Sequence, residues 1–205
     1  MITRREHWEN VYSTKQPHEV SWTQEFPKTS LDLINGLKLP KTASIIDVGG
    51  GDSRLVDYLL DEGYENISVL DISSHAIERT KQRLGNRSSK VHWIVSDITE
   101  FQPSLKYDCW HDRATFHFLI SEKDITAYLN AARQAVRKYL ILGTFSDMGP
   151  KKCSMLDVHQ YSEEELVQQL QKGFTRLKCF KENHTTPNHK TQNFLFCSFK
   201  RKPLD

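Results

Sequence analysis

The chain has 205 residues, of which 38% are hydrophobic and 26% charged, and its formal net charge is +2. This length fits one domain with a full core better than two small domains, and the composition argues against disorder. The small net charge does not indicate a nucleic-acid partner. No apolar run approaches the ~18 residues that a membrane span needs, so no membrane partner is expected.

The first twelve residues carry charges but no apolar segment behind them, which is not the pattern of a secretory signal. The four cysteines, Cys109, Cys153, Cys179 and Cys197, are scattered along the chain without a C-x-x-C pair. We therefore expect a cytoplasmic protein with reduced, mostly buried thiols, without a disulfide framework or a zinc site.

Residues 1–40 are rich in Trp, Gln and Glu and contain one predicted helix, from about Pro27 to Leu37. A glycine and then a proline end this helix. We expect residues 1–40 to form an N-terminal segment of a single domain, whose core comprises residues 41–205.

After residue 40, apolar runs rich in β-branched residues alternate with amphipathic segments of helical length. The predicted strands are Ala43–Gly49, Asn66–Ile72, Lys90–Ile98, Lys106–Arg113 and Tyr139–Phe145. The predicted helices are Ser53–Gly63, Ser73–Gly85, capped by Ser73 or Ser74, and Ser121–Lys138, capped by Ser121. This alternation is typical of parallel βαβ units with helices on both faces of a sheet.

The last part of the chain follows another pattern. A capped helix over residues 161–174 precedes two alternating strands, residues 176–183 and 193–201, with a turn-rich stretch between them. Such a pair is expected to lie antiparallel at one edge of the sheet. We therefore predict an α/β fold with a seven-stranded, mostly parallel sheet and a C-terminal antiparallel hairpin.

Three consecutive glycines, Gly49, Gly50 and Gly51, follow the first predicted strand. In doubly wound folds ligands bind beyond the carboxyl ends of the strands, and glycines let backbone N–H groups approach them. A tight strand-to-helix turn without a ligand is the alternative. No lysine follows, which excludes a nucleoside-triphosphate loop. Arg54 occupies the third glycine position of the dinucleotide fingerprint, which makes an NAD-linked oxidoreductase the weaker interpretation.

Acidic residues end the next two predicted strands. Asp71 lies 22 residues after Gly49, where a carboxylate can bind two ribose hydroxyls. Asp97, beside Ile98, could hold the amino group and the face of an adenine. An aspartate at a strand end is more often a helix N-cap, so the order and spacing of all three elements carry the interpretation.

Taken in order, these elements resemble the class I methyltransferases, which use S-adenosylmethionine (SAM). The resemblance runs from about Trp8 to the C-terminal hairpin through the motifs "DVGGGDS", "LDIS", "VSDIT" and "YDCWHDRATFHFL". It implies a three-layer, Rossmann-like sandwich and an enzyme that transfers a methyl group from SAM and releases S-adenosylhomocysteine.

The resemblance also implies which residues contact the cofactor. Asp47 and the glycine loop would hold the methionine end, Asp71 the ribose, and Asp97 with Ile98 the adenine. The expected contacts are Asp47, Gly49, Gly50, Gly51, Asp71, Ile72, Asp97, Ile98 and Trp22.

The N-terminal stretch "HWENVYSTKQPHEVSWTQ" contains Trp8, Tyr12 and Trp22. It resembles the lid of small methyltransferases, which folds over SAM and shapes the acceptor pocket. Its aromatic rings could favour the sulfonium through cation–π contact. The alternative is an aromatic-rich segment that only covers the core.

The loop after the fourth strand, "WHDRATFHFL", is expected to face the methyl group in this fold. Methyl transfer mainly requires positioning and exclusion of water. We predict His111, Asp112 and Arg113 as catalytic residues, with Asp112 or His111 as base or orienter and Arg113 as a binder of an anion or a thiol. The alternative makes Asp112 and Arg113 a local ion pair and His117 a histidine at the edge of the core. No metal is predicted, because the spacing of these side chains matches no standard site.

The possible functions differ in the molecule that accepts the methyl group. "WHDRA" resembles the "WDRG" of thiopurine-type thiol methyltransferases, with one residue inserted and Ala for Gly, which favours a small molecule such as a thiol. Protein lysine methyltransferases, which tend to carry "DKGT" where this chain has "DRAT", are one alternative. A non-catalytic SAM-binding module is another. Lys151, Lys152, Cys153 and the tract 184–194 either border the acceptor or form ordinary surface loops.

Overall fold

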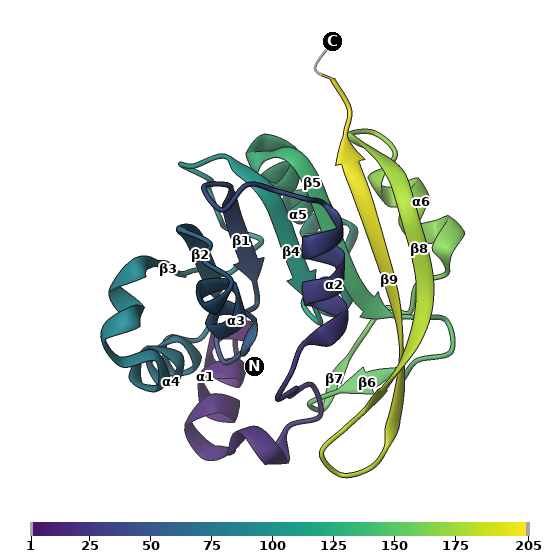
Figure 1. The fold of residues 1–205 in the computed structure, drawn as a ribbon. Coiled ribbons are helices and arrows are strands. Elements are labelled where there is room, and N and C mark those ends of the chain that lie inside the picture. The colour runs from purple at the N-terminus through teal and green to yellow at the C-terminus, as the bar shows by residue number, and fades with distance from the viewer. Residues whose placement is uncertain (1, 204–205) are drawn as a thin grey trace.

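A computed structural model describes residues 2–203 and contains one central sheet of seven strands (Figure 1). The strand order is β3-β2-β1-β4-β5-β9-β8. The first five strands in the chain pair in parallel, and β9 is antiparallel to both β5 and β8. The strands are β1 (Ser44–Val48), β2 (Asn66–Asp71), β3 (Val91–Val95), β4 (Tyr107–Arg113), β5 (Val136–Phe145), β8 (Phe174–Thr185) and β9 (Thr191–Arg201). The predicted α/β fold with its C-terminal hairpin is confirmed.

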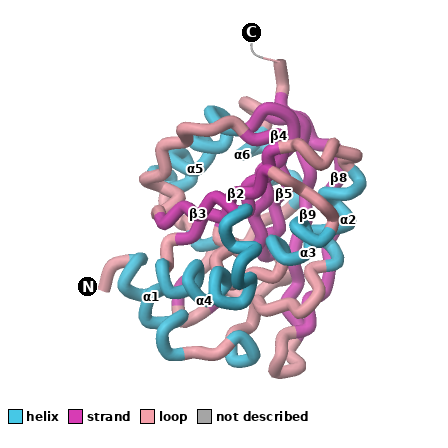
Figure 2. The backbone as a smooth tube through the Cα atoms, turned by 60° about the vertical axis from the view of Figure 1, so that its left-hand side comes forward, coloured by secondary structure: helices cyan, strands magenta, loops and turns pink. Residues whose placement is uncertain are grey.

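Helices cover both faces of the sheet, which makes the three layers visible in Figure 2. The helices α5 and α6 bury their apolar side chains against one face, and α2 and α3 bury theirs against the other. The helices are α1 (Arg4–Thr14), α2 (Lys28–Gly36), α3 (Leu55–Asp61), α4 (Ser74–Leu84), α5 (Glu122–Ala135) and α6 (Glu163–Leu170). Within residues 2–203, none of the helices combines the length and the apolar character that crossing a membrane requires.

Serine side chains begin three of these helices, as their sequences predict. Ser73, Ser121 and Ser162 each accept a hydrogen bond from the backbone N–H three residues later. Ser73, and not Ser74, is therefore the cap of α4. Gly85 ends the same helix at a φ of +57°, a conformation that favours glycine.

The helix α1 was absent from the sequence-based prediction. Thr3 accepts from the backbone N–H of Glu6, and the Glu6 carboxylate accepts from that of Thr3, which forms a capping box. The helix buries Trp8, Val11 and Tyr12. The T-x-x-E pattern before these apolar residues was the signal that could have revealed it.

The helix α5 ends earlier than predicted, at Ala135 rather than Lys138. Val136 instead begins β5 and pairs with Tyr107 of β4. The local sequence continues a helical pattern, but pairing with β4 places these residues in the sheet, because tertiary contacts override weak helix propensity.

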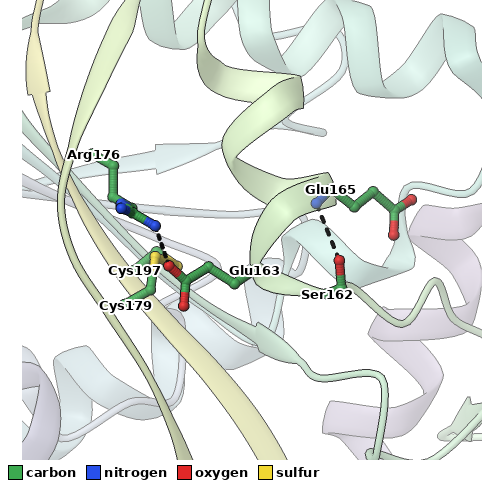
Figure 3. The surroundings of a disulfide bond; sticks show 6 residues. All are labelled: Ser162, Glu163, Glu165, Arg176, Cys179 and Cys197. Atoms are coloured by element: carbon green, nitrogen blue, oxygen red, sulfur yellow. Dashed lines mark hydrogen bonds and ion pairs between the residues drawn. A yellow bond between two sulfur atoms is a disulfide. The ribbon is translucent and has the colours of Figure 1, made fainter.

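The prediction that all cysteines are reduced is wrong for two of them. Cys179 and Cys197 are directly opposite in the β8–β9 pairing and form a disulfide (Figure 3). The two cysteines are 18 residues apart in the sequence, and only the register of the hairpin brings them opposite each other. The spacing of the cysteines along the chain therefore did not indicate the disulfide. Cys109 and Cys153 are buried and free, as predicted.

The ends of β1 and β4 point toward a cluster of connecting segments (Figure 1). The helix α1, the short pair β6 (Lys152–Cys153) and β7 (Leu156–Asp157), and the tip of the β8–β9 hairpin gather at this end of the sheet. The N-terminal segment and the back half of the chain thereby enclose the carboxyl ends of the parallel strands.

Candidate functional site

Two cavities meet at the carboxyl ends of the parallel strands. The larger encloses about 750 Å³ including its mouth, and extends from Asp97 and Asp71 past Gly49 to Phe194. The smaller extends from the glycine loop to His111. The side chains shared by both walls are Tyr12, Trp22 and Arg113.

The glycine loop folds closely onto the side chains around it. A Cβ at Gly49, whose φ is +71°, would lie 1.8 Å from Oγ1 of Thr115. A Cβ at Gly50 would lie 2.2 Å from a carboxylate oxygen of Asp47, and one at Gly51 would lie 2.6 Å from Oδ2 of Asp71. No side chain fits at these positions without displacing those groups.

The backbone N–H groups of this loop are used inside the protein. Those of Gly49 and Gly50 donate to the carbonyl oxygen of Leu70, at 2.7 and 3.3 Å. The N–H of Gly51 donates to Oδ2 of Asp71 at 2.9 Å. The expectation that the glycines free N–H groups for a ligand therefore needs correction, because they instead allow the loop to approach two carboxylates.

Asp71 ends β2 in the wall of the larger cavity, where its side chain is held in place. Oδ2 accepts from Gly51, and Oδ1 accepts from the N–H of Ser73 at 2.8 Å. Burial raises the pKa of this carboxyl to about 6, although both hydrogen bonds act in the other direction. Ile72 lines the same wall.

Asp97 follows β3 and lies in the same cavity with Ile98. Its carboxylate accepts from the guanidinium of Arg4 at 3.0 Å and from the N–H of Thr99 at 2.9 Å. Arg4 also pairs with Asp124 at 2.7 Å. Arg4, which no sequence motif indicated, therefore ties α1 to the predicted adenine side of the site.

Asp47, His111 and Ser30 form a buried chain of hydrogen bonds beside the smaller cavity. Oδ1 of Asp47 lies 2.7 Å from Nδ1 of His111, and Nε2 of His111 lies 2.8 Å from Oγ of Ser30. The carboxylate can only accept, so Nδ1 carries a proton. In the neutral ring Nε2 then accepts the hydroxyl proton of Ser30.

The second oxygen of Asp47, Oδ2, is buried and has no hydrogen-bond partner among the described residues. An unpaired buried carboxylate oxygen is costly unless a ligand supplies a donor. Asp47 lines the smaller cavity, where the ammonium group of a bound amino acid would satisfy it. His111 and Ser30 thus orient the carboxylate of Asp47, and Ser30 was not predicted.

Asp112 is fully buried and lines neither cavity. It accepts from the hydroxyl of Tyr128 at 2.8 Å and from the N–H of Thr115 at 3.0 Å. Burial raises the pKa of Asp112 to about 7. Its contacts anchor the loop after β4, which favours a supporting role over the predicted role of a base.

Arg113 ends β4 and lines both cavities. Its Nη1 donates to the carbonyl oxygen of Trp22 at 2.8 Å, and its guanidinium lies 4.8 Å from the ring centre of Phe194. Its Nε and Nη2 are buried without a hydrogen-bond partner among the described residues. It therefore does not form the local ion pair with Asp112 that the sequence left open.

His117 belongs to the core beneath the larger cavity. Its ring stacks on Phe145 with 4.1 Å between ring centres, and its Nδ1 lies 3.3 Å from the backbone nitrogen of Phe145. Burial lowers the pKa of His117 to about 3, so the ring is neutral at ordinary pH. This agrees with the alternative in which His117 is a core histidine.

The N-terminal segment supplies aromatic walls to the larger cavity. Trp8 packs edge-on against Trp22 and Phe118, with ring centres 5.6 and 5.0 Å apart. Glu9 on α1 accepts from the hydroxyl of Ser73 at 2.7 Å and from the N–H of Ser74 at 2.8 Å. The segment is therefore fastened to α4 through Glu9, a contact that no sequence pattern indicated.

Of the residues expected to border an acceptor, Cys153 lies in the cavity wall, together with Gln192 from the start of β9. Lys151 and Lys152 are exposed, and Lys152 pairs with Asp157 at 3.2 Å. Across residues 2–203, no three side chains of the metal-binding types converge into a candidate metal site.

Comparison with known proteins adds a family and a fold. A family model described as a methyltransferase domain matches residues 46–138. A malonyl-[acyl-carrier protein] O-methyltransferase of Anoxybacillus flavithermus is 33% identical over 51% of this chain and 39% of its own length. EEF1A lysine methyltransferase 2 of Mus musculus is 25% identical over 83% of this chain and 71% of its own length. The chain spans less than half the length of the malonyl-[acyl-carrier protein] O-methyltransferases that it matches.

Solved structures of low sequence identity share the fold. A SAM-dependent methyltransferase of Anabaena variabilis has a TM-score of 0.75 at 15% identity, covering 98% of this chain and 96% of its own. The N-methyltransferase NodS of Bradyrhizobium japonicum, in complex with S-adenosyl-L-homocysteine, has a TM-score of 0.72 at 14% identity, covering 95% and 96%. The three-layer fold is therefore a known architecture.

Proposed function

The chain belongs to the class I, Rossmann-like family of SAM-dependent methyltransferases, and on that premise we propose that it methylates a small molecule. One observation carries the proposal. A single cavity connects Asp71 at the end of β2 and Asp97 just after β3, past the glycine loop, with an aromatic enclosure at the ends of β4 and β5 and the start of β9. Together with the smaller cavity that meets it beside Gly49, this cavity can hold a cofactor and a compact acceptor end to end.

The residues on the cofactor side suit S-adenosylmethionine. Asp97 and Ile98 would hold the adenine, and Asp71 the ribose. Asp47 would hold the ammonium group of the methionine end, because its Oδ2 lacks a donor. When bound, SAM supplies an electrophilic methyl group on a sulfonium.

The acceptor side suits a soft nucleophile. Of the described residues that line the cavity there, from β4 onward in the chain, none is Asp, Glu or His. A thiol ionises near pH 8.5 and needs less help from a protein base than an alcohol. The rings of Trp22, Phe118 and Phe194 exclude water and orient the acceptor, which is the main task in this transfer. These features support a thiol as the acceptor.

Protein lysine methylation is the second candidate, and a specific observation favours it. The similarity to EEF1A lysine methyltransferase 2 of Mus musculus extends over most of both chains. The enclosure of the cavity by the N-terminal segment favours a small acceptor over a protein side chain.

Two experiments test these proposals. Isothermal titration with SAM and S-adenosylhomocysteine is expected to show binding at one site, and no binding by the folded protein would refute the proposed function. Tritiated SAM is then incubated with the protein and a cell lysate, and the products are separated by size. Label in the small fraction supports a metabolite acceptor, whereas label in macromolecules supports a protein acceptor. Cofactor binding without any transfer of label supports a non-catalytic SAM-binding module.

A further inference from the structure

We propose that the free edge of Arg113 is a carboxylate-binding subsite at the junction of the two cavities. The inference rests on the proposed function and deepens it, because it names a charged group that the site must accommodate. The carboxylate belongs either to the methionine end of the cofactor or to an acidic acceptor.

The first argument is the geometry of the unused donors. Arginine carries five N–H donors in a rigid plane. In Arg113, Nη1 is engaged by the carbonyl oxygen of Trp22, whereas Nε and Nη2 are buried and lack partners among the described residues. Nε–H and Nη2–H run parallel along one edge of the plane, and this edge matches the two oxygens of a carboxylate.

The second argument is the uncompensated charge. Burial lowers the pKa of Arg113 only to about 10, so the side chain remains a cation at neutral pH. The two carboxylates that influence it most, Glu182 and Asp47, form no hydrogen bond with it among the described residues. Glu182 accepts from the hydroxyl of Thr29, and Oδ1 of Asp47 is hydrogen-bonded to His111. A buried cation without an anion is destabilising, and a bound carboxylate would remove that penalty.

The third argument is the position of the guanidinium. The Trp22 carbonyl and the ring of Phe194 hold its plane, so its free edge is fixed before a ligand arrives. Gln192 adds a buried Oε1 without a partner among the described residues, in the wall of the larger cavity. That oxygen can accept a hydrogen bond from an O–H, N–H or S–H group of the same ligand.

The test uses Arg113→Gln and Arg113→Lys in the full-length protein. Glutamine removes the charge, whereas lysine keeps a charge without the planar fork. Arg201→Gln is the matched control, because Arg201 also donates to a carbonyl oxygen, that of Gly173, and stacks on a phenyl ring, that of Phe174. Arg201 does not line either cavity.

Four probes are titrated by calorimetry. S-adenosylhomocysteine carries the carboxylate of the cofactor's amino-acid end, whereas 5′-methylthioadenosine lacks that carboxylate and the α-amino group beside it. 3-Phenylpropionate and its neutral amide serve as acceptor analogues, each titrated with and without S-adenosylhomocysteine.

Two results support the proposal and distinguish its two sources. If the carboxylate is that of the cofactor, Arg113→Gln weakens S-adenosylhomocysteine binding by about tenfold to a hundredfold and leaves 5′-methylthioadenosine binding unchanged. If the carboxylate is that of the acceptor, the affinity of Arg113→Gln for S-adenosylhomocysteine stays within twofold of the wild-type value. In that case 3-phenylpropionate binds more tightly than its amide, and Arg113→Gln abolishes the preference. Arg113→Lys should restore only part of the loss, and Arg201→Gln should behave as wild type.

The proposal is overturned if Arg113→Gln, folded as judged by circular dichroism, matches wild type for all four probes. It is also overturned if Arg113→Lys binds the carboxylate probes as wild type does, since a point charge would then suffice. Failure of the wild type to bind S-adenosylhomocysteine would refute the proposed function instead. In that case the titrations of 3-phenylpropionate and its amide without S-adenosylhomocysteine still test the subsite. A preference for the carboxylate that Arg113→Gln abolishes supports it, and no such preference overturns it.

Discussion

The two ends of the larger cavity differ in how their charged groups are satisfied. At the cofactor end, Asp71 and Asp97 accept hydrogen bonds from backbone N–H groups and from Arg4. Toward the other end, where the two cavities meet, Arg113 keeps two buried donors without partners among the described residues. The carboxylates at the cofactor end are held in place by the protein's own donors, whereas the free donors of Arg113 are the proposed carboxylate subsite. The difference separates carboxylates that the protein positions before a ligand binds from a cation with two donors still unpaired within residues 2–203.

The largest effect is expected at Asp71, whose removal would disrupt the cofactor end. Asp71→Ala leaves the N–H groups of Gly51 and Ser73 unpaired, at a cost of about 1–3 kcal/mol each. We also expect S-adenosylhomocysteine affinity to fall at least a hundredfold, because the ribose loses its carboxylate. Calorimetry and urea denaturation measure the two effects. An unchanged affinity in the folded variant would show that the ribose is held elsewhere.

His111 tests whether the chain of hydrogen bonds behind the smaller cavity positions Asp47. His111→Ala leaves one more oxygen of a buried carboxylate unpaired, and we expect the free energy of unfolding to fall by about 3 kcal/mol. Ser30→Ala, the matched control one step further out, should cost only about 1 kcal/mol. Both values come from denaturant unfolding. Equal costs would mean that these hydrogen bonds do not depend on the Asp47 charge.

Asp112 provides a prediction about pH. Its pKa of about 7 in the folded protein lies above the usual 3.9. Between about pH 3.9 and about pH 7, the folded state therefore keeps a proton on Asp112 that the unfolded state has lost. This contribution to stability is therefore greatest below pH 4 and declines as the pH rises to about 7, by up to about 1.4 kcal/mol per pH unit. Asp112→Asn should remove this slope.

Stability measured from pH 4 to 8 in wild type and Asp112→Asn gives the comparison. We expect S-adenosylhomocysteine affinity to be nearly unchanged in the variant, because Asp112 lines neither cavity. If the pH slope is unchanged and only methyl transfer is lost, the predicted role of Asp112 as a base would be supported.

The smallest effect is expected where the N-terminal segment meets the adenine side. Arg4→Ala removes ion pairs to Asp97 and Asp124 that are partly exposed, which typically contribute about 0.2–1 kcal/mol. We expect a slight loss of stability and a release of Asp97 from one of its partners. Adenosine titration of the variant shows whether a freer Asp97 binds the base more or less tightly than the paired one.

Much of the fold could be predicted because it depends on local patterns. Alternating apolar runs and serine-capped helices indicated the layers and the order of the elements. The errors occurred where a partner distant in sequence decides the structure. Val136 joins the sheet because Tyr107 pairs with it, and the disulfide depends on the register of β8 and β9.

The site divides in the same way. The residue types and spacing of the glycine loop, Asp71 and Asp97 are enough to indicate the cofactor, because the strand ends of this fold bring such residues together. Neighbouring positions in one motif, such as Asp112 and Arg113, could not be distinguished by type alone. Both are charged and both end the same strand.

The amino-acid sequence alone specified the sheet and its flanking helices, since these follow from hydrophobic periodicity. The resemblance of its motifs to those of methyltransferases indicated the positions where the cofactor is expected. Only the tertiary structure shows which charged groups already have hydrogen-bond partners within the protein. Burial and the partners that packing brings within hydrogen-bond distance place Asp112 behind the site and leave the edge of Arg113 open among the described residues. The partner of Asp112 comes from α5, that of Arg113 from the loop before α2, and that of Asp97 from α1. No local sequence pattern predicts that these segments meet.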